Sequence, residues 1–426
     1  MCIRDRGEIM PENFHIDMPE AVRNIIHTIE EHGFKAYAVG GCIRDSILGR
    51  NPDDWDITTS AVPSQIKTFF KRTVDTGIAH GTVTIMIDKT GYEVTTYRID
   101  GEYEDGRHPK SVEFSDRLVD DLCRRDFTIN AMAYNDTDGF VDEFKGLDDL
   151  DTKIIRCVGE PELRFTEDAL RMMRAIRFSA QLGFTIDEAT WNAIKKLSPS
   201  ISKISMERVH VELGKTLMSA HPDYVAQYSE AGLFAPILPV IDNALKSRYK
   251  RKILATLQHT PDNIYLRYAA LFITSTPDEA AKTLRALKLD NKTVNTVSKL
   301  VELSKMDIEE TEPAVRTALN KYGRDFLPLW HELMMAVIQA SEDITGISNP
   351  AKVKHLLTLK RLGTDILARG DCFTIKDLDI SGNDLIEYGL QGHEIGETLK
   401  SLLDIVIENP KLNDKATLIA MIEHIK

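Results

Sequence analysis

Residues 40–60, GGCIRDSILGRNPDDWDITTS, place three aspartates in four positions between a glycine pair and a β-branched run. In a strand, residues two apart face the same side, so Asp54 and Asp56 should present their carboxylates together while Asp53 points away. Paired carboxylates repel each other unless a cation lies between them, and Mg²⁺ takes one or two carboxylates plus phosphate oxygens. The pattern predicts a metal site, although a solvated acidic turn before a strand fits the same residues.

The residues around this pair favour phosphate chemistry. Gly40 and Gly41, at the start of a predicted helix, allow backbone N–H groups to approach a phosphate. Arg44 adds a cation one turn later, although Asp45 is an equally good structural partner for it. Glu93 lies in YEVTTYR, on a strand that we expect beside the one carrying the aspartates. It is either a third acidic group near the metal or a surface glutamate.

The pattern of apolar residues predicts an α/β region up to about residue 145. Helical spacing of apolar residues predicts a helix over 18–33, and KAYAV (35–39) and WDITT (55–59) are typical of short strands. GTVTIMID (81–88) and the strand that begins at Tyr92 should form a hairpin through KTG. After this region strand signals are sparse, so the remaining two thirds should be all-α.

Composition narrows the class of protein. A chain of 426 residues with 42% hydrophobic content is too long for one ordinary core, so several domains are expected. It has neither a long apolar run nor a signal pattern, which predicts a cytoplasmic protein with no membrane segment. Five scattered cysteines argue against a disulfide framework or a structural zinc site. The net charge of −13 disfavours bulk coating of nucleic acid but leaves room for a local basic groove.

Six motifs in order resemble the class II tRNA nucleotidyltransferases, the CCA-adding enzymes. They are the opening stretch, TGIAHGTV, YEVTTYR, DGRHPKSVEF, RRDFTINAMAYN and RFTEDALRMMRAIRF. The resemblance implies an α/β nucleotidyltransferase head followed by an all-α neck, body and tail in a seahorse-like, multi-domain arrangement. It also implies Mg²⁺-dependent addition of C, C and A to the 3′ end of tRNA from CTP and ATP. The expected divisions are a non-native or disordered start (1–14), head (15–150), neck (151–215), body (216–345) and tRNA-binding tail (346–426).

The resemblance also assigns residues to roles. It makes Asp54 and Asp56 the metal ligands, with Glu93 near them, and it brings Arg125 of RRDFTINAMAYN to the nucleotide. It assigns the loop 103–114 to the switch between C and A addition.

EDALRMMRAIRF (167–178) contains the predicted nucleotide-selecting residues. On a helical wheel its apolar residues fall on one side, and Asp168, Arg171, Arg174 and Arg177 fall on the other. Salt-bridge pairs on a solvated helix would give the same pattern, but the resemblance favours nucleotide contact. Cytosine and adenine both present an exocyclic amine beside an unprotonated ring nitrogen, so the acceptor Asp168 next to the donor Arg171 can read both. Arg174 and Arg177 would then serve the triphosphate, and Glu167 would orient Arg171.

Three other functions fit parts of the sequence. A bacterial poly(A) polymerase shares the head, but it usually carries a basic segment where this chain has DTGIAHGTV (75–83). An A-adding tRNA nucleotidyltransferase would retain the same motifs, including the DGRHP loop. A catalytically silent RNA-binding protein would not need the retained acidic and arginine residues. The sequence leaves open whether the chain forms a homodimer.

Overall fold

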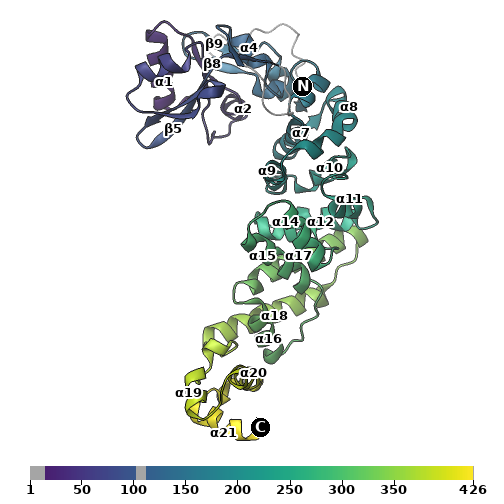
Figure 1. The fold of residues 1–426 in the computed structure, drawn as a ribbon. Helices are drawn as coiled ribbons and strands as arrows, with labels where there is room; N and C mark the ends of the chain where they lie inside the picture. Colours follow the sequence, from purple (N-terminus) through teal and green to yellow (C-terminus); the bar gives the residue numbers. More distant parts are fainter. Residues whose placement is uncertain (1–14, 102–111, 426) are drawn as a thin grey trace. The chain divides into compact units, whose positions relative to one another are not determined.

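The computed structural model describes residues 15–101 and 112–425 (Figure 1). Its contacts divide the chain into two compact units, residues 1–237 and 238–426, and the division falls within the Gly- and Pro-marked segment GLFAPILP. The expected non-native start and most of the loop 103–114 lie outside the described residues. No helix in the described ranges is both long and apolar enough to cross a membrane.

The first unit begins with a seven-stranded mixed sheet, in the purple and blue part of Figure 1. Helix α1 (Glu20–Glu31) packs against it and buries the four apolar residues whose spacing predicts the helix. The parallel pair in the sheet is β2–β5, and the other neighbours are antiparallel. The strand order is β3 (Thr73–Gly77), β4 (Thr82–Ile87), β5 (Thr90–Thr96), β2 (Ile57–Thr59), β1 (Ala36–Val39), β8 (Ala133–Asn135) and β9 (Gly139–Val141).

Smaller elements complete this part of the unit. A separate ribbon joins β6 (Arg98–Asp100) to β7 (Val112–Phe114) in antiparallel register on either side of the undescribed loop residues. The short helices are α2 (Gly41–Ile47), α3 (Pro63–Phe69), α4 (Leu118–Cys123) and α5 (Gly146–Thr152).

Two strand boundaries differ from the sequence prediction. Strand β2 begins at Ile57, so Asp54 and Asp56 precede the strand instead of lying within it. Aspartate is unfavourable in strands, and regular pairing starts only with the β-branched run. The predicted β4–β5 hairpin is confirmed, but its turn is Asp88–Lys89 and not KTG. Both turn residues have positive φ, as a type I′ turn requires.

Helices dominate the rest of the first unit. They are α6 (Pro161–Glu167), α7 (Leu170–Leu182), α8 (Glu188–Leu197), α9 (Met206–Leu217) and α10 (Ala226–Glu230), with β10 (Ile154–Ile155) and β11 (Thr185–Ile186) as a small parallel pair. The single helix predicted across 167–178 is therefore wrong. Asp168 has extended dihedrals, φ −144° and ψ 106°, and separates α6 from α7. Its carboxylate accepts a hydrogen bond from the Leu170 N–H, because aspartate satisfies free N–H groups at a helix start better than it fits a helix interior.

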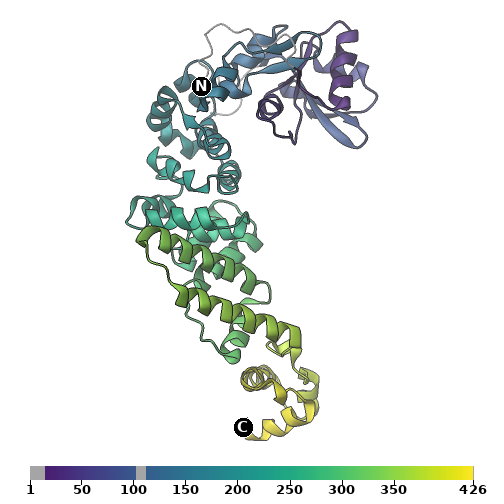
Figure 2. The same cartoon turned by 180° about the vertical axis from the view of Figure 1, so that it is seen from behind.

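The second unit is helical throughout its described residues. The long helices α17 and α18 lie side by side (Figure 2), and the last helices enclose a separate apolar cluster around Leu385, Leu402 and Leu418. The helices are α11 (Pro239–Lys246), α12 (Lys250–His259), α13 (Ile264–Leu271), α14 (Pro277–Ala286), α15 (Asn291–Leu303), α16 (Glu312–Tyr322), α17 (Phe326–Thr345), α18 (Pro350–Arg369), α19 (Gly382–Glu387), α20 (His393–Glu408) and α21 (Lys415–Ile425).

Candidate active site

Three carboxylates share one electrostatic environment at the start of β2. Ile57 pairs with Val94 in parallel register, so the residues preceding this pair are Asp56 and Glu93, as the sequence predicts for these two segments. Partial burial raises the pKa of Glu93, and the charges of Asp56 and Asp54 raise it further. Burial also raises the pKa of Asp56, with Arg125 opposing and Asp54 adding to the shift. The cluster therefore concentrates negative charge that a cation would neutralise.

The donor set fits a cation that is completed by substrate oxygens. In residues 15–101 and 112–425 no three His, Cys, Asp or Glu side chains converge as a metal-binding group. The involvement of Glu93 as a third acidic group near the metal stays a prediction. Two hard carboxylates, Asp54 and Asp56, are what Mg²⁺ typically takes from a protein when phosphates supply further ligands.

Gly40, more than Gly41, is the glycine that the turn before α2 requires. Gly40 has φ 86° and ψ −129°, a conformation that side chains disfavour. A Cβ built there would lie 2.7 Å from Nη1 of Arg125. Gly41 has no such constraint, because its Cβ would meet Nη2 of Arg44 at an ordinary 3.6 Å. The absence of a side chain at Gly40 therefore lets the Arg125 guanidinium lie directly against the turn.

Asp121 is a site residue that the sequence analysis missed. Its fully buried carboxylate accepts hydrogen bonds from Arg124 at 2.6 and 2.9 Å, from Arg125 at 3.3 Å and from the Thr58 hydroxyl at 3.1 Å. Burial would raise the pKa of Asp121, but the two arginine charges outweigh it and hold the pKa below its ordinary value. The spacing of this aspartate to the two arginines, three and four residues along, was the available signal.

Arg44 begins a chain of polar contacts that runs from α2 to α7. Its guanidinium forms a bidentate pair with Asp45 at 2.8 and 2.9 Å, the alternative that the sequence left open, and donates to Oδ1 of Asn130 at 2.6 Å. Asn130 donates to Asp126 at 3.1 Å, and Asp126 accepts from Arg174 at 2.7 Å. Burial would raise the pKa of Asp126, but Arg174 and Asn130 keep it well below its usual range.

Arg177 does not lie on an open polar face, so that part of the helical-wheel prediction is wrong. It is buried, donates to Glu212 and Gln181, and lies 3.7 Å from the Phe178 ring centroid. Glu212 belongs to α9, so the wheel could not include it. Arg174 also contacts the Phe178 ring, at 5.4 Å, but 35% of its side-chain surface remains exposed.

Asp168 lies at the break between α6 and α7, and Arg171 lies in the first turn of α7, where its backbone N–H donates to the Asp168 carbonyl oxygen at 3.0 Å. Arg208 of α9 donates two hydrogen bonds to the Asp168 carboxylate, at 2.7 and 3.2 Å. Arg171 donates to Glu167, as predicted, and to the carbonyl oxygens of Arg164 and Arg124. These contacts use three of the five guanidinium N–H donors of Arg171, so its Nε–H and one Nη2–H have no partner among the described residues. Asp168 likewise retains acceptor capacity beyond its contacts with Arg208 and Leu170.

The fold and site define a nucleotidyltransferase. A mixed sheet positions paired acidic residues beside a glycine turn and beside arginines that are fixed in place by aspartates. Three family models match successive parts of the chain. They describe a poly A polymerase head domain (36–156), a "probable RNA and SrmB- binding site of polymerase A" (183–245) and tRNA nucleotidyltransferase domain 2 (265–422).

Full-length relatives define the family more narrowly. The CCA-adding enzyme of Limosilactobacillus fermentum is 36% identical over 97% of this chain and 97% of its own length. That of Streptococcus suis is 35% identical over 98% of both chains. The crystal structure of the Bacillus stearothermophilus CCA-adding enzyme in complex with CTP is 31% identical, with a TM-score of 0.74, over 95% of this chain and 96% of that one. This chain belongs to the class II CCA-adding enzymes of the poly(A) polymerase/tRNA nucleotidyltransferase family.

Proposed function

We propose that this chain completes the 3′ end of tRNA by adding C, C and A from CTP and ATP, without a nucleic-acid template. The observation that carries the proposal is the pairing of two sites in one compact unit. One is the acidic cluster at the start of β2, and the other is the donor and acceptor pair at the α6–α7 break. The first suits transfer of a nucleotidyl group, and the second suits selection of a base.

Metal dependence is general in this family, and the proposal assigns Mg²⁺ to Asp54 and Asp56. A bound Mg²⁺ would activate the attacking 3′-hydroxyl and neutralise the oxygens of the leaving pyrophosphate. Asp54 and Asp56 would hold it, and their repulsion in its absence supports this role. Glu93 would keep the local field negative and increase attraction for the cation.

Arginines and backbone groups would bind the triphosphate. Arg125 lies against the glycine turn, and 19% of its side-chain surface is exposed. Arg174 is the most exposed of the three α7 arginines and is the best candidate among them for phosphate contact. The Gly41 N–H group would contribute from the turn. Arg44 would act by fixing Asn130, since its guanidinium is already engaged.

Asp168 and Arg171 would read the base. The remaining acceptor capacity of Asp168 suits the exocyclic amine of cytosine or adenine, and a free N–H of Arg171 suits the adjacent ring nitrogen. Arg208 and Glu167 would keep the two reading groups in fixed orientations. Uracil and guanine present the inverse donor and acceptor order and would be rejected.

The proposed macromolecular partner is tRNA, and the proposed location is the cytoplasm. The helical second unit would hold tRNA by its backbone and shape, so binding should weaken steeply with salt. The names of the full-length relatives favour CCA addition over poly(A) synthesis or A-only addition.

Incorporation of labelled nucleotides tests the proposal directly. The purified protein is incubated with tRNA transcripts that lack CCA, end in C or end in CC, and with an unstructured RNA. Each RNA receives CTP or ATP. We expect CTP to be used on the first two transcripts and ATP on the third. Addition of A alone would indicate an A-adding enzyme, long A tails on the unstructured RNA would indicate a poly(A) polymerase, and no incorporation would refute catalysis.

A further inference from the structure

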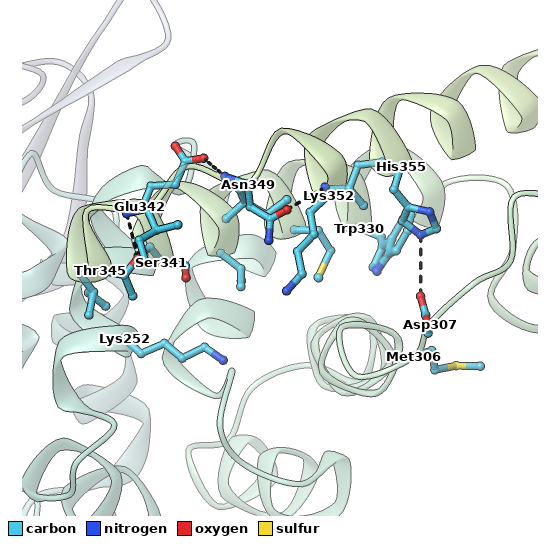
Figure 3. A pocket seen from close by; sticks show the side chains of 16 residues that line it. Lys252, Met306, Asp307, Trp330, Ser341, Glu342, Thr345, Asn349, Lys352 and His355 are labelled. Atoms are coloured by element: carbon cyan, nitrogen blue, oxygen red, sulfur yellow. Dashed lines mark hydrogen bonds and ion pairs between the residues drawn. The ribbon is translucent and has the colours of Figure 1, made fainter.

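The second unit contains a cavity that the proposed reaction does not use. It has a volume of about 740 Å³ and lies between α12, α17, the start of α18 and the segment after α15 (Figure 3). Its wall is mostly apolar, and this size and lining are typical of small-molecule sites. The apolar lining residues are Met306, Trp330, Met334, Val337, Ile338, Ile344, Ile347 and Leu356.

Two lysines direct positive charge into the cavity. Figure 3 shows the amino groups of Lys252, from α12, and Lys352, from α18, directed into the space between the helices. Neither lysine forms an ion pair with any residue that the structure describes.

The acidic side chains at the cavity edge are engaged elsewhere. Glu342 accepts hydrogen bonds from Ser348 and the Asn349 N–H, and Asp307 faces His355 at 3.8 Å. Neither carboxylate forms an ion pair with Lys252 or Lys352 in the part of the chain that the structure describes, and the Glu342 carboxylate points away from the space into which the two amino groups are directed (Figure 3).

We propose that this cavity binds a small amphipathic anion, a long-chain carboxylate, with its head group between Lys252 and Lys352 and its hydrocarbon body against the apolar wall. The flexible thioethers of Met306 and Met334 can adapt to an unbranched chain. An RNA backbone fits less well, since phosphodiesters would satisfy the lysines but leave the apolar wall in contact with water.

Fluorescence quenching tests the proposal on the full-length protein. The chain has three tryptophans, Trp55, Trp191 and Trp330, and Trp330 is the one that lines the cavity. The probe is ω-bromoundecanoate, whose bromine quenches a tryptophan that it contacts. We expect saturable quenching that persists when Trp55 and Trp191 are both changed to Phe. Quenching that is lost in this variant, or that never saturates, would overturn the proposal.

Charge variants test the head-group site. Exposed charge contacts contribute roughly 0.2–1 kcal/mol each, so Lys252→Gln with Lys352→Gln should weaken binding of the carboxylate by about two- to thirtyfold. Binding of the neutral analogue ω-bromoundecanol should be unchanged. Lys360→Gln, an exposed lysine of α18 outside the cavity, is the matched control and should bind both probes normally. Equal weakening of both probes would refute the anion site. Loss of quenching on addition of tRNA lacking CCA would instead assign the cavity to the tRNA surface.

Discussion

Replacing Asp168 by Asn tests how the chain selects its nucleotides. Asn keeps an oxygen that can cap the Leu170 N–H, but it removes the charge and introduces a donor where the base expects an acceptor. A good bidentate base contact is worth roughly 1–3 kcal/mol of discrimination, and 1.4 kcal/mol corresponds to about tenfold. The preference for CTP over UTP should therefore fall by about tenfold or more.

The same change also weakens an ion pair, so stability must be measured separately. The side chains of Arg208 and Asp168 are only 24% and 16% exposed, and loss of their charged contacts should lower the free energy of unfolding by about 1.5–3 kcal/mol. Arg208→Gln removes the same pair while keeping the Asp168 acceptor, so it is the matched control for stability.

The assay is the ratio of kcat/KM for CTP and UTP on tRNA lacking CCA, with urea unfolding of each variant alongside. The variants are Asp168→Asn, Asp168→Ala, Arg171→Ala and Arg208→Gln. If the ratio is unchanged in all three variants of Asp168 and Arg171, then base selection lies elsewhere, and the loop 103–114 becomes the leading candidate.

Three further perturbations test the rest of the site. We expect Mg²⁺ to raise the Tm of the wild type, because a bound ion stabilises the folded state by mass action; Asp56→Asn should abolish incorporation of both nucleotides and this rise in Tm, whereas Asp53→Ala should retain incorporation and the rise. Asp121→Asn should lower the free energy of unfolding at neutral pH by about 1.5–3 kcal/mol. Folding lowers the pKa of Asp121 below its ordinary value of 3.8, so the wild type should be more stable than the variant at pH values above 3.8. This difference in the free energy of unfolding should disappear as the pH falls through the lowered pKa of the folded state. Gly40→Ala should reduce kcat/KM for both nucleotides by displacing the guanidinium behind the turn, whereas Gly49→Ala, with a similar φ of 69° but nothing within 4 Å of its Cβ, should cost stability alone.

Features set by local periodicity were predictable from the sequence. The buried face of α1 and the β4–β5 hairpin follow from residues close along the chain, and both are confirmed. The strand of Glu93 was expected beside the acidic segment, and it is the neighbour of β2, but the parallel direction of the pair comes from the structure.

Features set by distant partners were not predictable. Arg177 has the spacing of an exposed arginine, but Glu212, 35 residues away, draws it into the interior. The break at Asp168 could not be predicted, because its neighbours on both sides favour helix. The Asp168 carboxylate stabilises the break by accepting hydrogen bonds from the Leu170 N–H and from the Arg208 side chain.

The polar chain from Arg44 through Asn130 and Asp126 to Arg174 has a consequence for exchanging parts between relatives. Its first three members lie in the segment that matches the head model, and the last lies on a helix beyond that segment. A chimera of two relatives joined near residue 150 would therefore take one part of this hydrogen-bond network from each parent. The two parts would not have evolved together. Joining at Ile237 and Leu238 keeps the network on one side of the seam. The acidic cluster and the base-reading pair should be inherited as one block, because both lie in the first unit.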